Sequence, residues 1–280
     1  MEQTKPNCPA TRAGKGARVV AFTGAALFLG LGFLGPSAVS AASITGCVAK
    51  RQVFTTYSPA TALRAKLARH EPIRILAIGS SSTEGIGASS PDRAYPAQLE
   101  GELSEDWKGN VSVVNAGKGG ETGVQTVERL EAALKTQPFD LVIWQVGTND
   151  AIKGVSEDDF RAILERGIAA VKTTGASLIL LDQQYFPTIK DPSRYERFVH
   201  VVSALGRERQ IPVFSRYALM QDWNSQSAEE LRSMLSSDGF HMSDKGYDCL
   251  ADQVAEAIQT LVEVPAHARQ DTATQIAKVH

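Results

Sequence analysis

Five short apolar segments, rich in β-branched residues, recur along the chain and are separated by stretches with helical periodicity. The segments cover residues 73–79, 111–117, 139–147, 176–184 and 211–215. Each is nearly continuous in apolar residues, which is typical of strands that are buried on both faces. Strands that alternate with helices form a parallel sheet with helices on both sides. The pattern therefore predicts an α/β fold, a three-layer αβα sandwich with a central five-stranded, mostly parallel sheet.

Two of the intervening helices have clear signals in the sequence. Ser156 is a suitable N-cap, and the three acidic residues that follow it favour the positive end of a helix dipole. The last helix is expected to start near Ser243 and to carry an apolar stripe from Tyr247 to Leu261, which suits a helix that covers the sheet. A further helix is expected over residues 55–69, ahead of the first strand.

The first 42 residues have the layout of a secretory signal peptide. Basic residues precede an apolar run at 19–34, and small residues at 39–42 suit signal peptidase. The run is shorter than the roughly 20 residues of a membrane-spanning helix, but an uncleaved anchor and a lipoprotein motif at 44–47 remain alternatives. We expect a periplasmic or secreted protein, with a signal peptide at 1–42, a lead-in segment at 43–72, a globular domain at 73–264 and a disordered tail at 265–280.

Charge and cysteine content limit the partners of the chain. With 29 Lys and Arg against 31 Asp and Glu, the 280-residue chain has no excess of basic residues for a nucleic-acid backbone, so no nucleic acid is expected as a partner. Removal of the signal peptide would leave two cysteines, Cys47 and Cys249. Oxidising compartments favour their pairing, whereas Cys249 also suits a helix interior, so the sequence leaves the disulfide open. No cluster has the spacing of metal ligands, and neither metal nor cofactor is expected.

Polar residues gather directly after the apolar segments, where open parallel sheets bind ligands. The first segment is followed by GSSSTEG at 79–85, the second by residues 115–122 and the third by residues 147–150. The serine loop lacks the lysine of a phosphate-binding P-loop, and the glycine spacing of a dinucleotide-binding fingerprint is absent. A serine nucleophile and a plain polar turn remain as the two interpretations.

A serine nucleophile needs an imidazole base and a carboxylate that orients the imidazole. Of the five histidines, only His241 lies in a polar loop with an acidic residue, Asp238, three positions before it. Residue types alone do not decide which of the serines at 80–82 is the nucleophile. The glycine-rich segment 115–122 and the amide of Asn149 supply the donors that a tetrahedral oxyanion needs, although each also suits an ordinary turn.

In this order, the polar segments resemble the four sequence blocks of the SGNH (GDSL-type) hydrolase family. The resemblance implies that Ser81 is the nucleophile and that Asp238 and His241 complete a catalytic triad. It also implies an oxyanion hole formed by Ser81, Gly120 and Asn149. The chain departs from the family pattern at residue 80, where a serine stands in place of the usual Asp; that residue is not the family's nucleophile or base.

The same resemblance implies a flavodoxin-like SGNH hydrolase fold and a serine esterase that works through an acyl-enzyme. For an exported protein, the expected substrates are small-molecule or glycan esters, either short-chain acyl esters or acylated carbohydrates. No stable membrane insertion is expected after the signal peptide is removed. The alternatives are an O-acyltransferase that acts on glycans and a catalytically silent glycan-binding module of the same fold.

Overall fold

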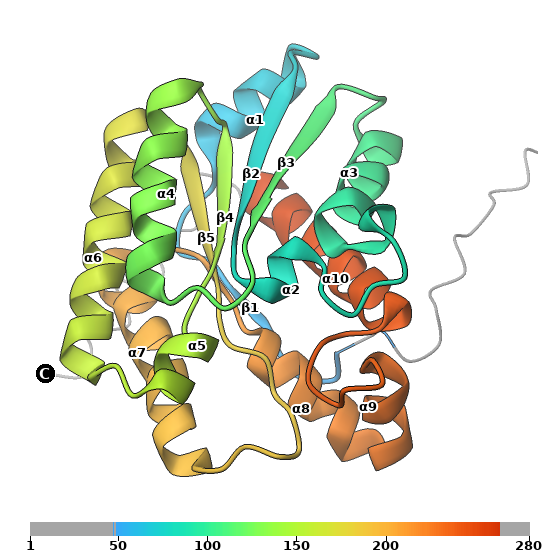
Figure 1. Ribbon diagram of the computed structural model, residues 1–280. Coiled ribbons are helices and arrows are strands. Elements are labelled where there is room, and N and C mark those ends of the chain that lie inside the picture. Colours follow the sequence, from blue (N-terminus) through green and yellow to red (C-terminus); the bar gives the residue numbers. More distant parts are fainter. Residues whose placement is uncertain (1–46, 48, 264–280) are drawn as a thin grey trace, which may run out of the picture. The chain divides into compact units, whose positions relative to one another are not determined.

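One six-stranded sheet forms the centre of the fold (Figure 1). The computed structural model describes residue 47 and residues 49–263, and within them the strand order is β1-β6-β5-β4-β2-β3. β1 is antiparallel to β6, and all other neighbours are parallel. The strands are β1 (Phe54–Thr55), β2 (Ile73–Gly79), β3 (Val111–Gly117), β4 (Leu141–Gln145), β5 (Ser177–Leu181) and β6 (Val213–Phe214).

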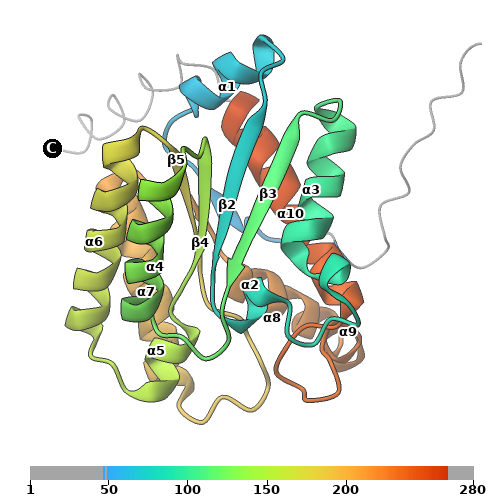
Figure 2. The same cartoon turned by 45° about the horizontal axis from the view of Figure 1, so that its top comes forward.

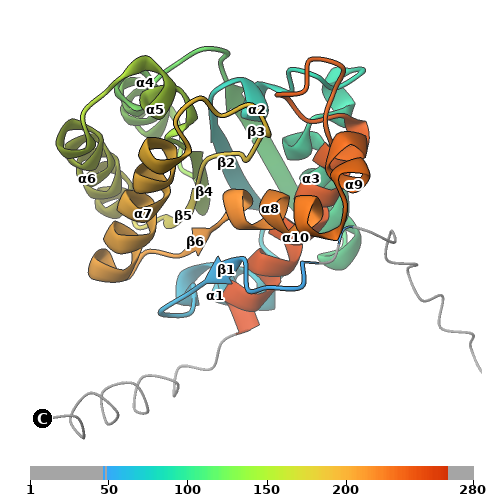
Figure 3. The same ribbon diagram turned by 90° about the horizontal axis from the view of Figure 1, so that it is seen from below.

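Helices connect the strands and cover both faces of the sheet. They are α1 (Thr61–Ala68), α2 (Ser81–Glu84), α3 (Tyr95–Asp106), α4 (Gly123–Thr136), α5 (Thr148–Lys153), α6 (Glu157–Thr174), α7 (Pro192–Arg209), α8 (Arg216–Gln226), α9 (Ala228–Met234) and α10 (Asp244–Glu263), with a short 3-10 turn at Pro91–Arg93. α4, α6 and α7 lie on one face (Figure 2). α3, α8 and α10 lie on the other, as the view from below shows (Figure 3).

Alternate residues of each central strand enter one of two apolar cores. In β2, Ile73 and Ile75 pack with the α3 and α10 layer, whereas Leu76 and Ile78 pack with the α4 and α6 layer, and all four are at most 1% exposed. Burial of each such side chain contributes about 1.5–3 kcal/mol to folding. The continuous apolar runs of the sequence are thus strands covered on both faces, and the predicted αβα sandwich is confirmed.

The helix boundaries follow the local signals closely. The side chain of Ser156 accepts a hydrogen bond of 3.1 Å from the backbone N–H of Asp159, so α6 begins where its cap was expected. α10 begins at Asp244, immediately after the expected start near Ser243. At α4, Thr122 and Gln125 form a capping box, which satisfies backbone donors at the start of that helix.

The segment ahead of the first long strand differs from its expected form. Of the residues 55–69 that were expected to be helical, only those of α1 form a helix. The strand β1 precedes α1 and adds a sixth, antiparallel strand to the sheet. The register pairs Phe54 with Phe214 and Thr55 with Val213. A two-residue strand has no periodicity of its own, and its pairing with a strand more than 150 residues later is not visible locally.

A disulfide joins Cys47 to Cys249 in α10. Both side chains are buried, with exposures of 1% and 0%. The bond closes a loop of 202 residues and attaches the segment before β1 to the layer that covers the sheet. The expected signal peptide at 1–42 and the expected tail at 265–280 lie outside the residues that the structure describes.

Candidate active site

The predicted nucleophile lies at the carboxyl end of the central strand β2. Ser81 is the first residue of α2, which follows β2 directly (Figure 1). A left-handed Gly85, with φ of 102°, ends α2 after one turn. At Gly117, an added Cβ would lie 1.9 Å from the backbone nitrogen of Glu84, so β3 can approach α2 this closely only with glycine at that position. Short connections and close backbone packing therefore hold the serine at the edge of the sheet.

The structure brings Ser81, His241 and Asp238 into one chain of hydrogen bonds. Ser81 Oγ lies 3.0 Å from His241 Nε2, across 160 positions of sequence. His241 Nδ1 lies 2.6 Å from Asp238 Oδ2. When Nδ1 carries the imidazole hydrogen and donates a hydrogen bond to the carboxylate, Nε2 has a free lone pair that can accept the hydroxyl proton of the serine. This is the geometry that general-base activation of a serine requires.

The carboxylate of Asp238 is held by its own loop. Its Oδ1 accepts the backbone N–H groups of Phe240 and His241, each at 2.9 Å, and the hydroxyl of Ser236 at 2.8 Å. Burial acts to raise the pKa of Asp238, but these bonds and the bond to His241 outweigh it, and the pKa lies well below its usual value. The carboxylate therefore stays charged at pH values where an ordinary aspartate would be protonated.

The serines on either side of Ser81 have other partners. Ser80 Oγ donates to Gln145 Oε1 at 3.0 Å, and Ser82 Oγ donates to Gln184 Oε1 at 2.8 Å. Both hydroxyls are buried, with residue exposures of 5% and 2%. Of these three serines, only Ser81 has a hydrogen bond to the histidine.

The predicted oxyanion donors belong to the glycine-rich loop before α4 and to α5, which contact each other. Gly120 has a left-handed φ of 76°, and its carbonyl accepts Lys153 Nζ at 2.6 Å. Asn149 Nδ2 donates to the backbone carbonyl of Glu121 at 2.8 Å, which uses one of its two amide hydrogens. A Cβ added at Gly119 would lie 3.9 Å from the Cβ of Ser81, so this glycine-rich segment runs beside that serine.

Gln184 connects α2, through Ser82, to the loop that carries His241, and the sequence did not predict it. Its side chain is 1% exposed, accepts from Ser82 Oγ and donates through Nε2 to the carbonyl of Phe240 at 2.9 Å. These partners are the direct neighbours of Ser81 and His241 in sequence. The available signal was a glutamine at the end of an otherwise apolar strand segment; Gln145 has the same signal and contacts Ser80.

An apolar cavity opens beside the histidine. It has a volume of about 450 Å³, and its lining includes Ile152, Phe186, Ile189 and Phe240. The Phe240 ring packs edge-on against the His241 ring, with centroids 4.7 Å apart. Another cavity, of about 490 Å³, lies at the amino ends of β5 and β6. None of the predicted site residues lines either cavity, and Phe240 is what places the first one next to His241.

Residue 47 and residues 49–263 contain no group of three or more His, Cys, Asp and Glu side chains placed to hold a metal ion. Among the same residues, no helix is long and apolar enough to cross a bilayer.

Comparisons with known proteins agree with this architecture. Residues 46–264 match the Non-GDSL lipase-like family. Thioesterase 1/protease 1/lysophospholipase L1 of Escherichia coli (strain K12) is 26% identical over 197 residues, which cover 67% of this chain and 84% of that protein. The arylesterase of Vibrio mimicus is 23% identical over 190 residues, 66% of this chain and 88% of that protein. A solved peptidoglycan O-acetylesterase shares the fold, with a TM-score of 0.62 and 15% identity over 75% of this chain and 99% of that one.

The family match covers more than half of the chain. Ser80 stands where the GDSL pattern has Asp, in keeping with a family named for lacking that pattern. The curated relatives are ester- and thioester-cleaving enzymes by name. The chain therefore belongs to the Non-GDSL lipase-like family and is an ester hydrolase of the SGNH type.

Proposed function

We propose that the protein is an exported serine esterase in which Ser81 is the nucleophile, His241 the general base and Asp238 the residue that orients the imidazole. The observation that carries the proposal is the continuous hydrogen-bonded chain from Ser81 Oγ through His241 to Asp238. A serine hydroxyl is a weak nucleophile until a neutral imidazole takes its proton, and this arrangement places one at hydrogen-bond distance.

The proposed reaction has two halves. Ser81 Oγ attacks the ester carbonyl, and its proton moves to His241 Nε2, which then protonates the departing alkoxide. Water next attacks the acyl-enzyme, with the same imidazole taking its proton and returning it to Ser81. In both halves the oxyanion is stabilised by the backbone N–H groups of Ser81 and Gly120 and by the free amide hydrogen of Asn149.

The proposed substrates are short-chain acyl esters or acylated carbohydrates. The cavity beside Phe240 is apolar in its main lining residues, and it suits the acyl chain of such an ester. One relative is named an arylesterase, and a solved structure of the same fold is named a peptidoglycan O-acetylesterase, which is a name for an enzyme that cleaves acetyl esters. Short chains fit a cavity of about 450 Å³ without a long channel.

Export is the second part of the proposal. The basic start, apolar run and small residues of 1–42 support a signal peptide, and the Cys47–Cys249 disulfide suits an oxidising compartment. The exported chain would comprise the lead-in segment 43–72, the hydrolase domain 73–264 and the tail 265–280. Protein recovered from the periplasm of a Gram-negative host is expected to begin near Ala42 or Ser43 by mass spectrometry, and full-length chain found only in membranes would contradict this.

The activity is tested with p-nitrophenyl esters from acetate to laurate, run beside acetylated sugars. Wild-type protein is expected to prefer the short esters, and Ser81→Ala is expected to lose at least about 10³-fold in kcat. Ser80→Ala and Ser82→Ala serve as matched controls that keep the middle hydroxyl. A wild-type protein that turns over none of these esters, or a covalent serine reagent that labels Ser80 or Ser82, would refute the proposal.

A further inference from the structure

The oxyanion donor Gly120 lies in a backbone segment with little stiffness of its own. Glycine occupies positions 117, 119 and 120 between β3 and α4. Glycine adopts left- and right-handed backbone conformations almost equally, so such a segment loses more freedom on ordering than any other. A donor that must point at a developing charge needs fixed geometry. Contacts from outside the segment therefore have to supply the order.

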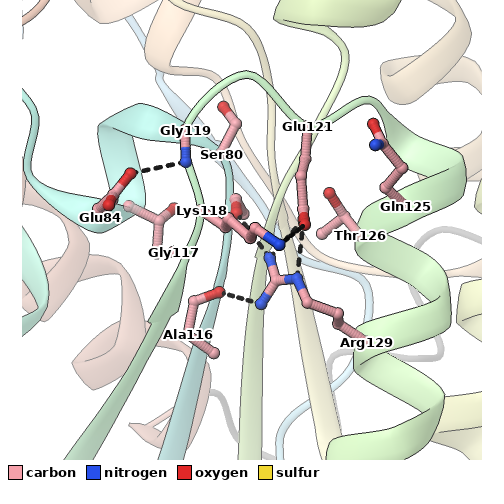
Figure 4. Close-up of polar contacts among 12 residues, drawn as sticks. Ser80, Glu84, Ala116, Gly117, Lys118, Gly119, Glu121, Gln125, Thr126 and Arg129 are labelled. Carbon is pink, nitrogen blue, oxygen red and sulfur yellow. Dashed lines mark hydrogen bonds and ion pairs between the residues drawn. The ribbon is translucent and has the colours of Figure 1, made fainter.

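The guanidinium of Arg129, in α4, contacts three places around this segment (Figure 4). Nη1 donates to the carbonyl of Ala116 at 2.7 Å, near the end of β3. Nη2 donates to the carbonyl of Gly79 at 3.1 Å, the last residue of β2. Nε donates to Glu121 Oε2 at 2.8 Å. One side chain thus joins the strand that precedes Ser81, the strand that precedes Gly120 and the residue that follows Gly120.

Glu121 is the acidic partner of this contact and is 7% exposed. Arg129 Nη2 lies 2.7 Å from its Oε2, and Lys118 Nζ lies 3.7 Å from its Oε1 (Figure 4). The backbone carbonyl of Glu121 accepts the side-chain amide of Asn149, the second predicted oxyanion donor. Without Arg129, this buried carboxylate would keep only the more exposed Lys118 as a cation and would oppose the negative charge that forms on a substrate oxygen bound at Gly120.

Glu84 secures the other side of the segment. Its Oε2 accepts the backbone N–H of Gly119 at 2.6 Å, from the last residue of the helix that begins with Ser81 (Figure 4). Gly120 is therefore held between Gly119, which is bonded to α2, and Glu121, which is bonded to α4. Both of these contacts use charged side chains, and they fix a glycine-rich stretch of backbone in place.

We propose that Arg129 and Glu121 are positioning residues for the oxyanion hole. The inference rests on the proposed function, in which Gly120 and Asn149 stabilise the oxyanion. Arg129 has two roles in it: its forked donors fix the ends of β2 and β3 relative to Glu121, and its charge compensates the carboxylate beside the site. Neither residue contacts the substrate, so the effect falls on the transition state through Gly120 and Asn149.

The test compares variants in the p-nitrophenyl acetate assay. Arg129→Gln is expected to lower kcat about 10- to 100-fold while KM changes less than about threefold, because only transition-state stabilisation is lost. Arg129→Gln combined with Glu121→Gln also removes the carboxylate that has lost its nearer cation, and it is expected to recover at least about threefold in kcat over the single variant. Arg166→Gln, which breaks a more exposed 2.7 Å pair with Glu131, is the matched control and is expected to retain wild-type kcat.

Arg129→Lys keeps the positive charge but loses the several donors that the planar guanidinium holds in fixed directions. Its kcat is expected to be lower by about fivefold or more. It carries the test if circular dichroism shows that Arg129→Gln does not fold. Wild-type kcat in either Arg129 variant, a loss confined to KM, or a double variant no faster than the single would overturn the inference. Ser81→Ala separates the two proposals: its full activity would refute the proposed function, whereas an inactive Ser81→Ala with a fully active Arg129→Gln would refute only the positioning role.

Discussion

The disulfide between Cys47 and Cys249 encloses almost the whole described domain, and its removal is expected to be costly. The bond spans 202 positions, from ahead of β1 to α10. In the chain-entropy model, closing a loop of that length removes enough freedom from the unfolded chain to stabilise the fold by about 5 kcal/mol. For a domain of this size, each kcal/mol corresponds to about 2–4 °C in Tm, so Cys47→Ala with Cys249→Ala should lower Tm by roughly 10–20 °C.

The assay is thermal unfolding followed by circular dichroism, with and without a reductant. Reduced wild type is expected to unfold at the temperature of the double variant, and the reductant should leave the double variant unchanged. The two single variants should match the double, because either one opens the loop. Titration that finds Cys47 and Cys249 as free thiols in protein recovered from an oxidising compartment, or a double variant whose Tm equals that of the oxidised wild type, would refute the reasoning.

The remaining predictions concern the site. Gln184→Glu places a carboxylate oxygen against the carbonyl of Phe240, so kcat/KM is expected to fall about tenfold near neutral pH. The loss should be smaller at low pH, because a protonated carboxyl can again donate to that carbonyl, and an equal loss at all pH values would contradict this. Because its hydrogen bonds lower the pKa of Asp238, its carboxylate stays charged and should not contribute to a fall of wild-type kcat/KM between pH 4 and 8. The fall on acidification should therefore have a slope of no more than one, and a slope of two would contradict this. Ile189→Trp fills part of the apolar cavity and should lower kcat/KM for octanoate relative to acetate about tenfold, and an unchanged ratio would place the acyl chain elsewhere.

The sequence by itself determined the layers of the fold. Strand runs such as 73–79 and the Ser156 cap are local signals, because burial on both faces and the dipole of a helix end act on neighbouring residues. These signals placed five strands and the main helices without knowledge of their partners. They could not place β1, whose two residues become a strand only by pairing with β6.

The site depended on contacts between distant segments. The order of the sequence blocks predicted Ser81 as the nucleophile. In the structure Ser81 differs from Ser80 and Ser82, because those two hydroxyls donate to Gln145 and Gln184, which follow more than 60 and 100 positions later. In the sequence, nothing distinguishes Arg129 from an ordinary surface residue of a helix. Its carbonyl partners at Gly79 and Ala116 adjoin only because β2 and β3 are parallel and end at the same edge. Hydrophobic periodicity in the sequence predicts which side chains are buried. Which polar groups then come into contact depends on how the strands and helices pack in the folded sheet.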